Sequence, residues 1–390
     1  MITKIKSSMN DIPCEVLFYI LSMLPLKYLM KLKRVCKTWC LLINELFDLH
    51  VKHMQNTYHG ILLFHVRHSS DDTVEATISA LRIGLSPEII GLMTLTHGRT
   101  RPYQHFHMMQ SVNGLICVTN QEVFTVCNPL TKEVVTLPIC RNNPVPRHDH
   151  PSHRVPHGFG FGYNSSTKEY KVVKIYNFVP NADDDVKKII RYECAVFTLG
   201  SKSNSWRNIE GPSYPVCVWF GAISLDGALY WIVRREGKML MTFFDIDKEK
   251  FTSLEILGFL ANQKVFHFGV VQGRVWAGLI QPMEGEDYND IWICNGEPER
   301  NVEIWIMVDD YGHHWVKKHV ILHEEYHTYW IPTVDCLIIL DEERLLLQRQ
   351  SFGAVQSFAF YNLKSKVYED FEILTGHNYR GAIRYSWESK

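Results

Sequence analysis

The sequence lacks the features that mark several large classes of protein. No apolar run in its 390 residues reaches the roughly 18 residues that a membrane-spanning helix needs. Its 41 Lys and Arg residues nearly balance its 42 Asp and Glu residues, so bulk charge favours neither nucleic acid nor an anionic membrane as a partner. The ten cysteines include no Cys-x-x-Cys pair, and we expect reduced, mostly buried thiols.

The N-terminus also differs from a signal peptide. Its lysines are followed by a stretch that contains Asp11, Pro13 and Glu15 and is amphipathic rather than uniformly apolar. We therefore expect a protein of the cytosol, with the nucleus also open. Apolar residues make up 46% and charged residues 21% of the chain, which is typical of a soluble globular protein. The length allows one small module and one large domain.

Residues 9–50 carry the periodicity of short helices. Asp11 can cap a first helix, and Pro13 stands in its first turn, where proline is tolerated. Pro25 interrupts the apolar pattern, which then restarts and predicts two further helices. The apolar residues of the three predicted helices are Val16, Leu17, Ile20, Leu21 and Leu24; Leu29, Met30 and Leu32; and Val35, Cys36, Trp39, Cys40, Ile43, Leu46 and Phe47.

A module of about 40 residues cannot easily bury so much apolar surface alone. Two interpretations stay open from the residues themselves. The helices could pack as a cap on the rest of their own chain, or they could complete their core on a partner protein. Cys36 and Cys40 lie one helical turn apart, and without further ligands we interpret both as core residues.

The order of residues in this module resembles an F-box. The matching pieces are Ile12-Pro13-x-Glu15-Val16-Leu17, Ile20-Leu21-x-x-Leu24-Pro25-x-x-x-Leu29 and Arg34-Val35-Cys36-Lys37-x-Trp39. In that family the motif docks on the Skp adaptor subunit of a cullin-RING ubiquitin ligase. The resemblance implies adaptor contacts, or support for them, at Pro13, Leu17, Ile20, Leu21, Leu24, Pro25, Leu29, Val35, Cys36 and Trp39.

The character of the chain changes from His59 onward. Short runs rich in Val, Ile, Phe, Tyr and Trp alternate with turns of Gly, Asn, Asp and Ser, which is typical of strands and hairpins. We divide the chain into a tail, the F-box-like module, a connector and a β domain. Their predicted boundaries are 1–8, 9–50, 51–58 and 59–390.

The β domain contains a degenerate repeat of two strands around a polar turn. About five such units lie between Ser111 and Ile373, at spacings of roughly 45–60 residues that match propeller blades. The predicted strands at 60–66 and 74–81 could form a sixth unit with the C-terminal segment and close the ring. The predicted fold is therefore a small all-α three-helix module followed by an all-β domain, a kelch-like β-propeller of about six blades. A two-sheet sandwich is the alternative, although some 20 strands are many for one.

Short pieces of this domain resemble the F-box-associated domain of plant F-box proteins. They are Asn113-Gly114-Leu115-Ile116, Asn128-Pro129-x-Thr131, Leu137-Pro138, Gly158-Phe159-Gly160-Phe161-Gly162-Tyr163, Tyr170-Lys171-Val172-Val173 and Ile304-Trp305-x-Met307. Within that family the pattern is similar to S-locus F-box and S-locus-F-box-like proteins. That similarity implies a pistil ribonuclease as the target and a role in self-incompatibility.

We find no pattern that predicts catalysis, a metal site or a cofactor. The segment 147–157 contains His and Asp residues that could bind zinc or copper, but nearby prolines favour a partner-facing loop. The alternating glycines 158, 160 and 162 are not followed by a helix, so they indicate close backbone approach near a propeller axis rather than a dinucleotide loop. Five tryptophans are expected to pack between blades: Trp206, Trp231, Trp276, Trp305 and Trp315.

The two resemblances imply a non-catalytic substrate receptor of an SCF-type (Skp–cullin–F-box) ubiquitin ligase. The F-box would bind the adaptor, and through it the cullin and RING subunits. The β domain would hold a target protein for ubiquitination and proteasomal degradation, although the sequence names no target-binding residue. A glycan- or protein-binding propeller outside any ligase, and a propeller enzyme such as a copper oxidase, are the alternatives.

Overall fold

A computed structural model gives the structure of the protein. It describes residues 13–22, 32, 35–43, 61–68, 73–82, 88–98, 106–140, 156–178, 191–201, 203–214, 216, 221–235, 238–255, 264–271, 274–280, 302–308, 314–321, 337–339, 343–349, 355–374 and 379–384.

The described helices belong to the N-terminal module. Helix α1 spans Cys14–Ser22, and the carbonyl of Pro13 accepts the first N–H bonds at 3.0 and 3.1 Å, as expected for a proline at the start of a helix. Residues 37–43 are also helical. The predicted second helix lies almost entirely outside the described residues, so the three-helix arrangement stays a prediction.

The β domain consists of four-stranded antiparallel sheets, six of them within the described residues. Sheet 1 contains β24 (Tyr379–Arg384), β1 (Ile61–His68), β2 (Thr73–Arg82) and β3 (Glu88–Gly98). Sheet 2 contains β4 (His107–Met108), β5 (Ile116–Thr119), β6 (Phe124–Asn128) and β7 (Glu133–Thr136). Sheet 3 contains β8 (Pro156–Asn164), β9 (Glu169–Phe178), β10 (Arg191–Thr198) and β11 (Arg207–Glu210).

The other three sheets follow in chain order. Sheet 4 contains β12 (Ile223–Leu225), β13 (Ala228–Arg235), β14 (Lys238–Asp245) and β15 (Lys250–Glu255). Sheet 5 contains β16 (Lys264–Val271), β17 (Arg274–Ile280), β18 (Val302–Met307) and β19 (Trp315–Ile321). Sheet 6 contains β20 (Leu337–Ile339), β21 (Arg344–Arg349), β22 (Val355–Asn362) and β23 (Tyr368–Leu374).

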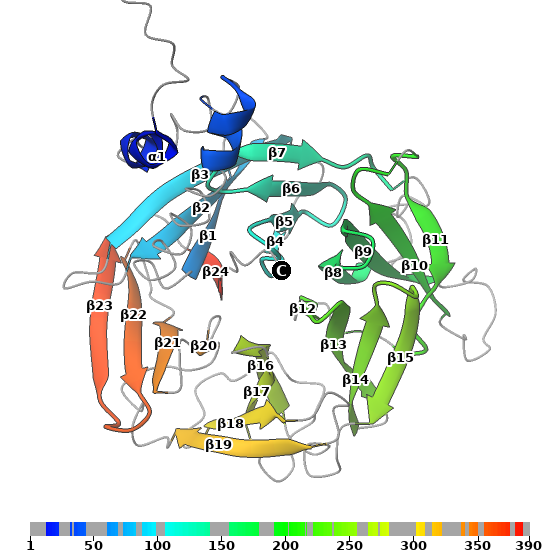
Figure 1. Cartoon of the computed structure of the whole chain (residues 1–390). Helices are drawn as coiled ribbons and strands as arrows, with labels where there is room; N and C mark the ends of the chain where they lie inside the picture. Colours follow the sequence, from blue (N-terminus) through cyan, green and yellow to red (C-terminus); the bar gives the residue numbers. More distant parts are fainter. Residues whose placement is uncertain are drawn as a thin grey trace, which may run out of the picture.

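The sheets stand around a common centre as the blades of a β-propeller (Figure 1). Strands β4, β8, β12, β16, β20 and β24 lie nearest the centre of the ring. The last strand, β24, pairs with β1, with Arg384 opposite Ile61, so the end of the chain completes the sheet that its first strands begin. This is the ring closure that the sequence predicted, and the sandwich alternative is wrong.

One predicted strand is a turn in the structure. The apolar residues of Ser111–Thr119 predict one continuous strand, but only β5 is a strand there. Val112 and Leu115 form an isolated bridge around Asn113 and Gly114, whose φ angles are 48° and 77°. Two successive positive φ angles make the type I′ turn that Asn-Gly favours. The innermost strand of sheet 2 is instead β4, which the sequence did not predict.

Four polar turns share one hydrogen-bond design. They begin at Asn128, Asn164, Asp245 and Asn362, and in each the side-chain oxygen accepts the N–H groups two and three residues further on. The residue four positions after the first has a left-handed φ, which is 62° at Lys132 and 54° at Glu249. Asn and Asp favour such turns because their side chains replace a main-chain acceptor. The turns therefore set the register of the strands that they join.

Adjacent sheets pack through large apolar side chains. Trp231 of β13 is fully buried, and its ring nitrogen donates to the carbonyl of Phe159 on β8 at 3.2 Å. A Cβ at Gly160 would lie 2.7 Å from Leu229 and 2.9 Å from Trp231, so the glycines of β8 make room for side chains of sheet 4. The sequence predicted a close approach to the glycine positions of this strand. The structure shows that approach, and the groups that come close are side chains of sheet 4 rather than another backbone. Packing between sheets is also found for Trp206 and Trp315.

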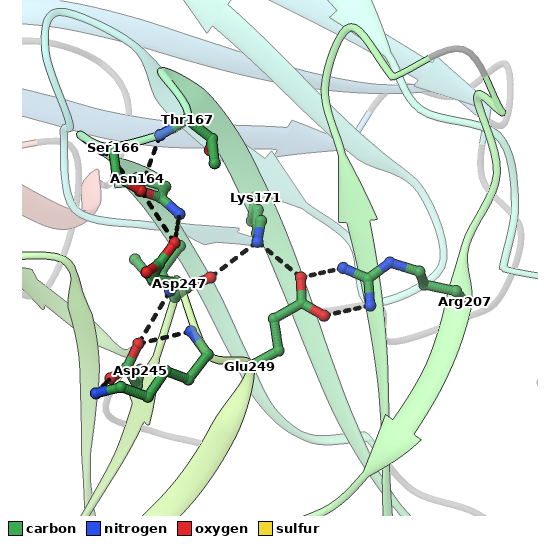
Figure 2. Close-up of polar contacts among 10 residues, drawn as sticks. Asn164, Ser166, Thr167, Lys171, Arg207, Asp245, Asp247 and Glu249 are labelled. Carbon is green, nitrogen blue, oxygen red and sulfur yellow. Dashed lines mark hydrogen bonds and ion pairs between the residues drawn. The ribbon is translucent and has the colours of Figure 1, made fainter.

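A polar network strengthens the same boundary between sheets 3 and 4 (Figure 2). The Lys171 ammonium, on β9, donates to the carbonyl of Ile246 at 2.8 Å and to the carboxylate of Glu249 at 2.7 Å. Arg207, on β11, pairs with the same carboxylate. Burial alone would raise the pKa of Glu249, but the bonds from Arg207 and Lys171 outweigh it and hold that pKa below its ordinary value. Glu249 therefore joins the two sheets as a carboxylate.

The shared turn design gives a matched pair of glycine substitutions. Lys132 is exposed, so Lys132→Gly relieves left-handed strain and should raise the free energy of unfolding by about 0.5–1 kcal/mol. Glu249→Gly relieves the same strain but removes one partner of the buried Lys171 ammonium. This substitution should therefore lower the free energy of unfolding by about 1–3 kcal/mol. Urea denaturation followed by circular dichroism measures both. Equal effects of the two substitutions would contradict the role given to Glu249.

Candidate functional site

The N-terminal module has a small core of its own. Leu17 and Leu21 lie one helical turn apart on α1 and are 6% and 1% exposed. They pack with Ile43, which is fully buried and comes from the helical residues 37–43. Phe18 and Trp39 pack partly buried against this cluster. These contacts hold α1 against the later helical segment.

The same module leaves large apolar side chains exposed. We call Val16, Tyr19, Ile20, Val35 and Leu41 the outer set. Ile20 is 46% exposed, Tyr19 67% and Leu41 70%. Leu21 and Ile43, on the same helical segments, are almost fully buried. Several large apolar side chains left exposed on one small module are typical of a protein that binds a partner. The described part of the module therefore has both an inner core and an uncovered apolar surface.

The ten residues predicted to serve adaptor binding fall into three groups. Leu17, Leu21 and Trp39 belong to the core or pack against it, which suits support of the module rather than direct contact. Pro13, Ile20, Val35 and Cys36 are exposed and available for contact. The remaining three, Leu24, Pro25 and Leu29, lie outside the described residues. No contact with a partner is tested for any of the ten.

Three members of the outer set, Val16, Tyr19 and Leu41, are not among the ten predicted adaptor-binding residues, although Val16 was expected on the apolar face of the first helix. Tyr19 follows Val16 by three residues, a spacing that places both on one side of α1. Leu41 stands between Cys40 and Leu42, which are partly buried. Because successive residues of a helix point in different directions, Leu41 faces away from the core and is exposed. Helical periodicity could have found Tyr19 and Leu41. The expectation that Cys36 is a core residue is wrong, because it precedes the helical residues 37–43 and is exposed.

The cysteines of the β domain behave as predicted where the structure describes them. Cys117, Cys127, Cys140 and Cys194 are free and buried. Burial raises the pKa of Cys127 to about 12, so its thiol stays protonated at neutral pH. Among the described residues, no three His, Cys, Asp or Glu side chains come together in a way that could hold a metal ion. Most of the histidine-rich segment 147–157 lies outside that part of the chain.

No helix in the described part of the chain has the length and apolar character needed to cross a membrane. The β domain has its own complete ring, in which β24 pairs with β1. The strands of its described sheets all come from residues 61–384, and none comes from the described part of the helical module. The outer set is the group of exposed large apolar side chains that the described part of the module carries.

Comparison with known proteins gives matches over both parts of the chain. Residues 9–52 match the F-box-like family, and residues 62–384 match the F-box associated beta propeller domain family. Relatives from Arabidopsis thaliana include F-box protein At1g52495, which is 24% identical over 79% of this chain and 69% of its own length. F-box protein CPR1 is 26% identical over 77% of this chain and 73% of its own.

A third relative of the same plant is F-box/kelch-repeat protein At4g19930, 24% identical over 81% of this chain and 70% of its own length. Among solved structures, "Structure of Dos1 propeller" covers 77% of this chain and 65% of that chain, with 9% identity and a TM-score of 0.39. A TM-score at that level is too low to support a conclusion about function.

The division between core and outer set predicts different effects of substitutions on neighbouring residues of α1. Leu21→Ala removes a buried side chain and should destabilise the module by about 2–4 kcal/mol. Ile20→Ala, at an exposed position, should change its stability by less than about 0.5 kcal/mol. Hydrogen exchange of residues 13–43 in the full chain measures the difference. Equal protection in both variants would show that Leu21 does not hold the helices together.

Proposed function

The chain belongs to the plant F-box proteins with a C-terminal F-box associated domain, and we propose that it is the substrate receptor of an SCF-type ubiquitin ligase. In this role the F-box binds a Skp-type adaptor, and the adaptor connects the receptor to the cullin and RING subunits. The β-propeller binds a target protein that is then ubiquitinated and degraded. The receptor itself carries out no covalent step.

The observation that carries this proposal is the outer set of the F-box. Val35 is 53% exposed and Ile20 46% exposed, next to a core that is almost fully buried. Removing apolar surface from water contributes about 25 cal/mol per Å², so covering several such side chains supplies a large part of a stable interface. The propeller completes its own sheets and leaves this surface to another protein.

The mechanism is proximity. A receptor that holds the target on a ligase raises the effective concentration of target lysines near the activated ubiquitin. A closed ring suits this task because its last strand completes the first sheet and its loops are held by a rigid scaffold. Catalysis belongs to other subunits of the ligase, and the receptor determines which protein is modified.

Narrower features of the role belong to the same proposal. We take the six described sheets as the six blades of the propeller, and we place the protein in the cytosol, with the nucleus also open. Similarity of the sequence to S-locus F-box proteins supports a pistil ribonuclease as the target and pollen-side recognition in self-incompatibility as the process. The kelch-like character of the blades is supported by the F-box/kelch-repeat relative.

Adaptor binding is tested with a matched pair of substitutions. Val35→Asp places a carboxylate in the proposed interface, which should cost at least about 2 kcal/mol and weaken the affinity for a purified Skp-type adaptor about 30-fold or more. Val135→Asp is the control, because Val135 on β7 is 55% exposed and Val35 is 53% exposed. Isothermal titration calorimetry gives both affinities. Ile20→Asp should act in the same direction as Val35→Asp.

The outcome decides between the proposal and its alternatives. Loss of binding in Val35→Asp and Ile20→Asp, with normal binding in Val135→Asp, supports the adaptor-docking role of the outer set. Unchanged binding in both F-box variants contradicts it. If the unsubstituted chain does not bind the adaptor at all, the alternative of a binding propeller outside a ligase gains support.

A further inference from the structure

We draw no further inference here: the strongest candidate, the outer edge of sheet 2 along β7, where Val134 and Val135 are exposed, is a short edge strand, and nothing in the described part of the chain shows what covers it.

Discussion

The pairing of β24 with β1 is the constraint on which the rest of the β domain depends. Without β24 the inner edge of β1 would be left unpaired, and the last strand of the chain covers it and completes the first sheet. The contact joins residues from the two ends of the domain, Ile61 and Arg384, so the whole domain must be present before the ring is complete. Within the described residues, the helices of the F-box contribute no strand to the ring.

The boundaries between sheets use two complementary devices. Between sheets 3 and 4, a strand with glycine at alternate positions leaves space that Trp231 and Leu229 fill. A few residues away, Glu249 binds Lys171 and Arg207 from the neighbouring sheet. Apolar packing supplies most of the free energy at such a boundary, and the polar bonds satisfy charged groups that packing would otherwise bury at a cost. The result is a rigid ring that can hold a partner in a fixed place.

The sequence predicted the parts of this structure that depend on local chemistry. The dipeptide Asp226-Gly227 predicts a tight hairpin turn, and its φ angles of 45° and 76° agree with that. Closure by the C-terminal segment followed from counting repeats. Asn113-Gly114 was placed inside a strand because the apolar residues around it obscured the same turn signal. In the F-box, composition alone does not separate exposed from buried apolar residues: Tyr19 and Leu41 are exposed, and their helical spacing, which the sequence contains, would have indicated it.

The central claim is that the F-box engages the adaptor through its exposed apolar surface while the propeller stays free for a target. Hydrogen exchange of the full chain with and without a purified Skp-type adaptor tests it most directly. The account predicts that the adaptor slows exchange within residues 13–43 and leaves the strands of the ring, from 61 to 384, unchanged. Slower exchange in the ring, or no change in residues 13–43, would contradict it.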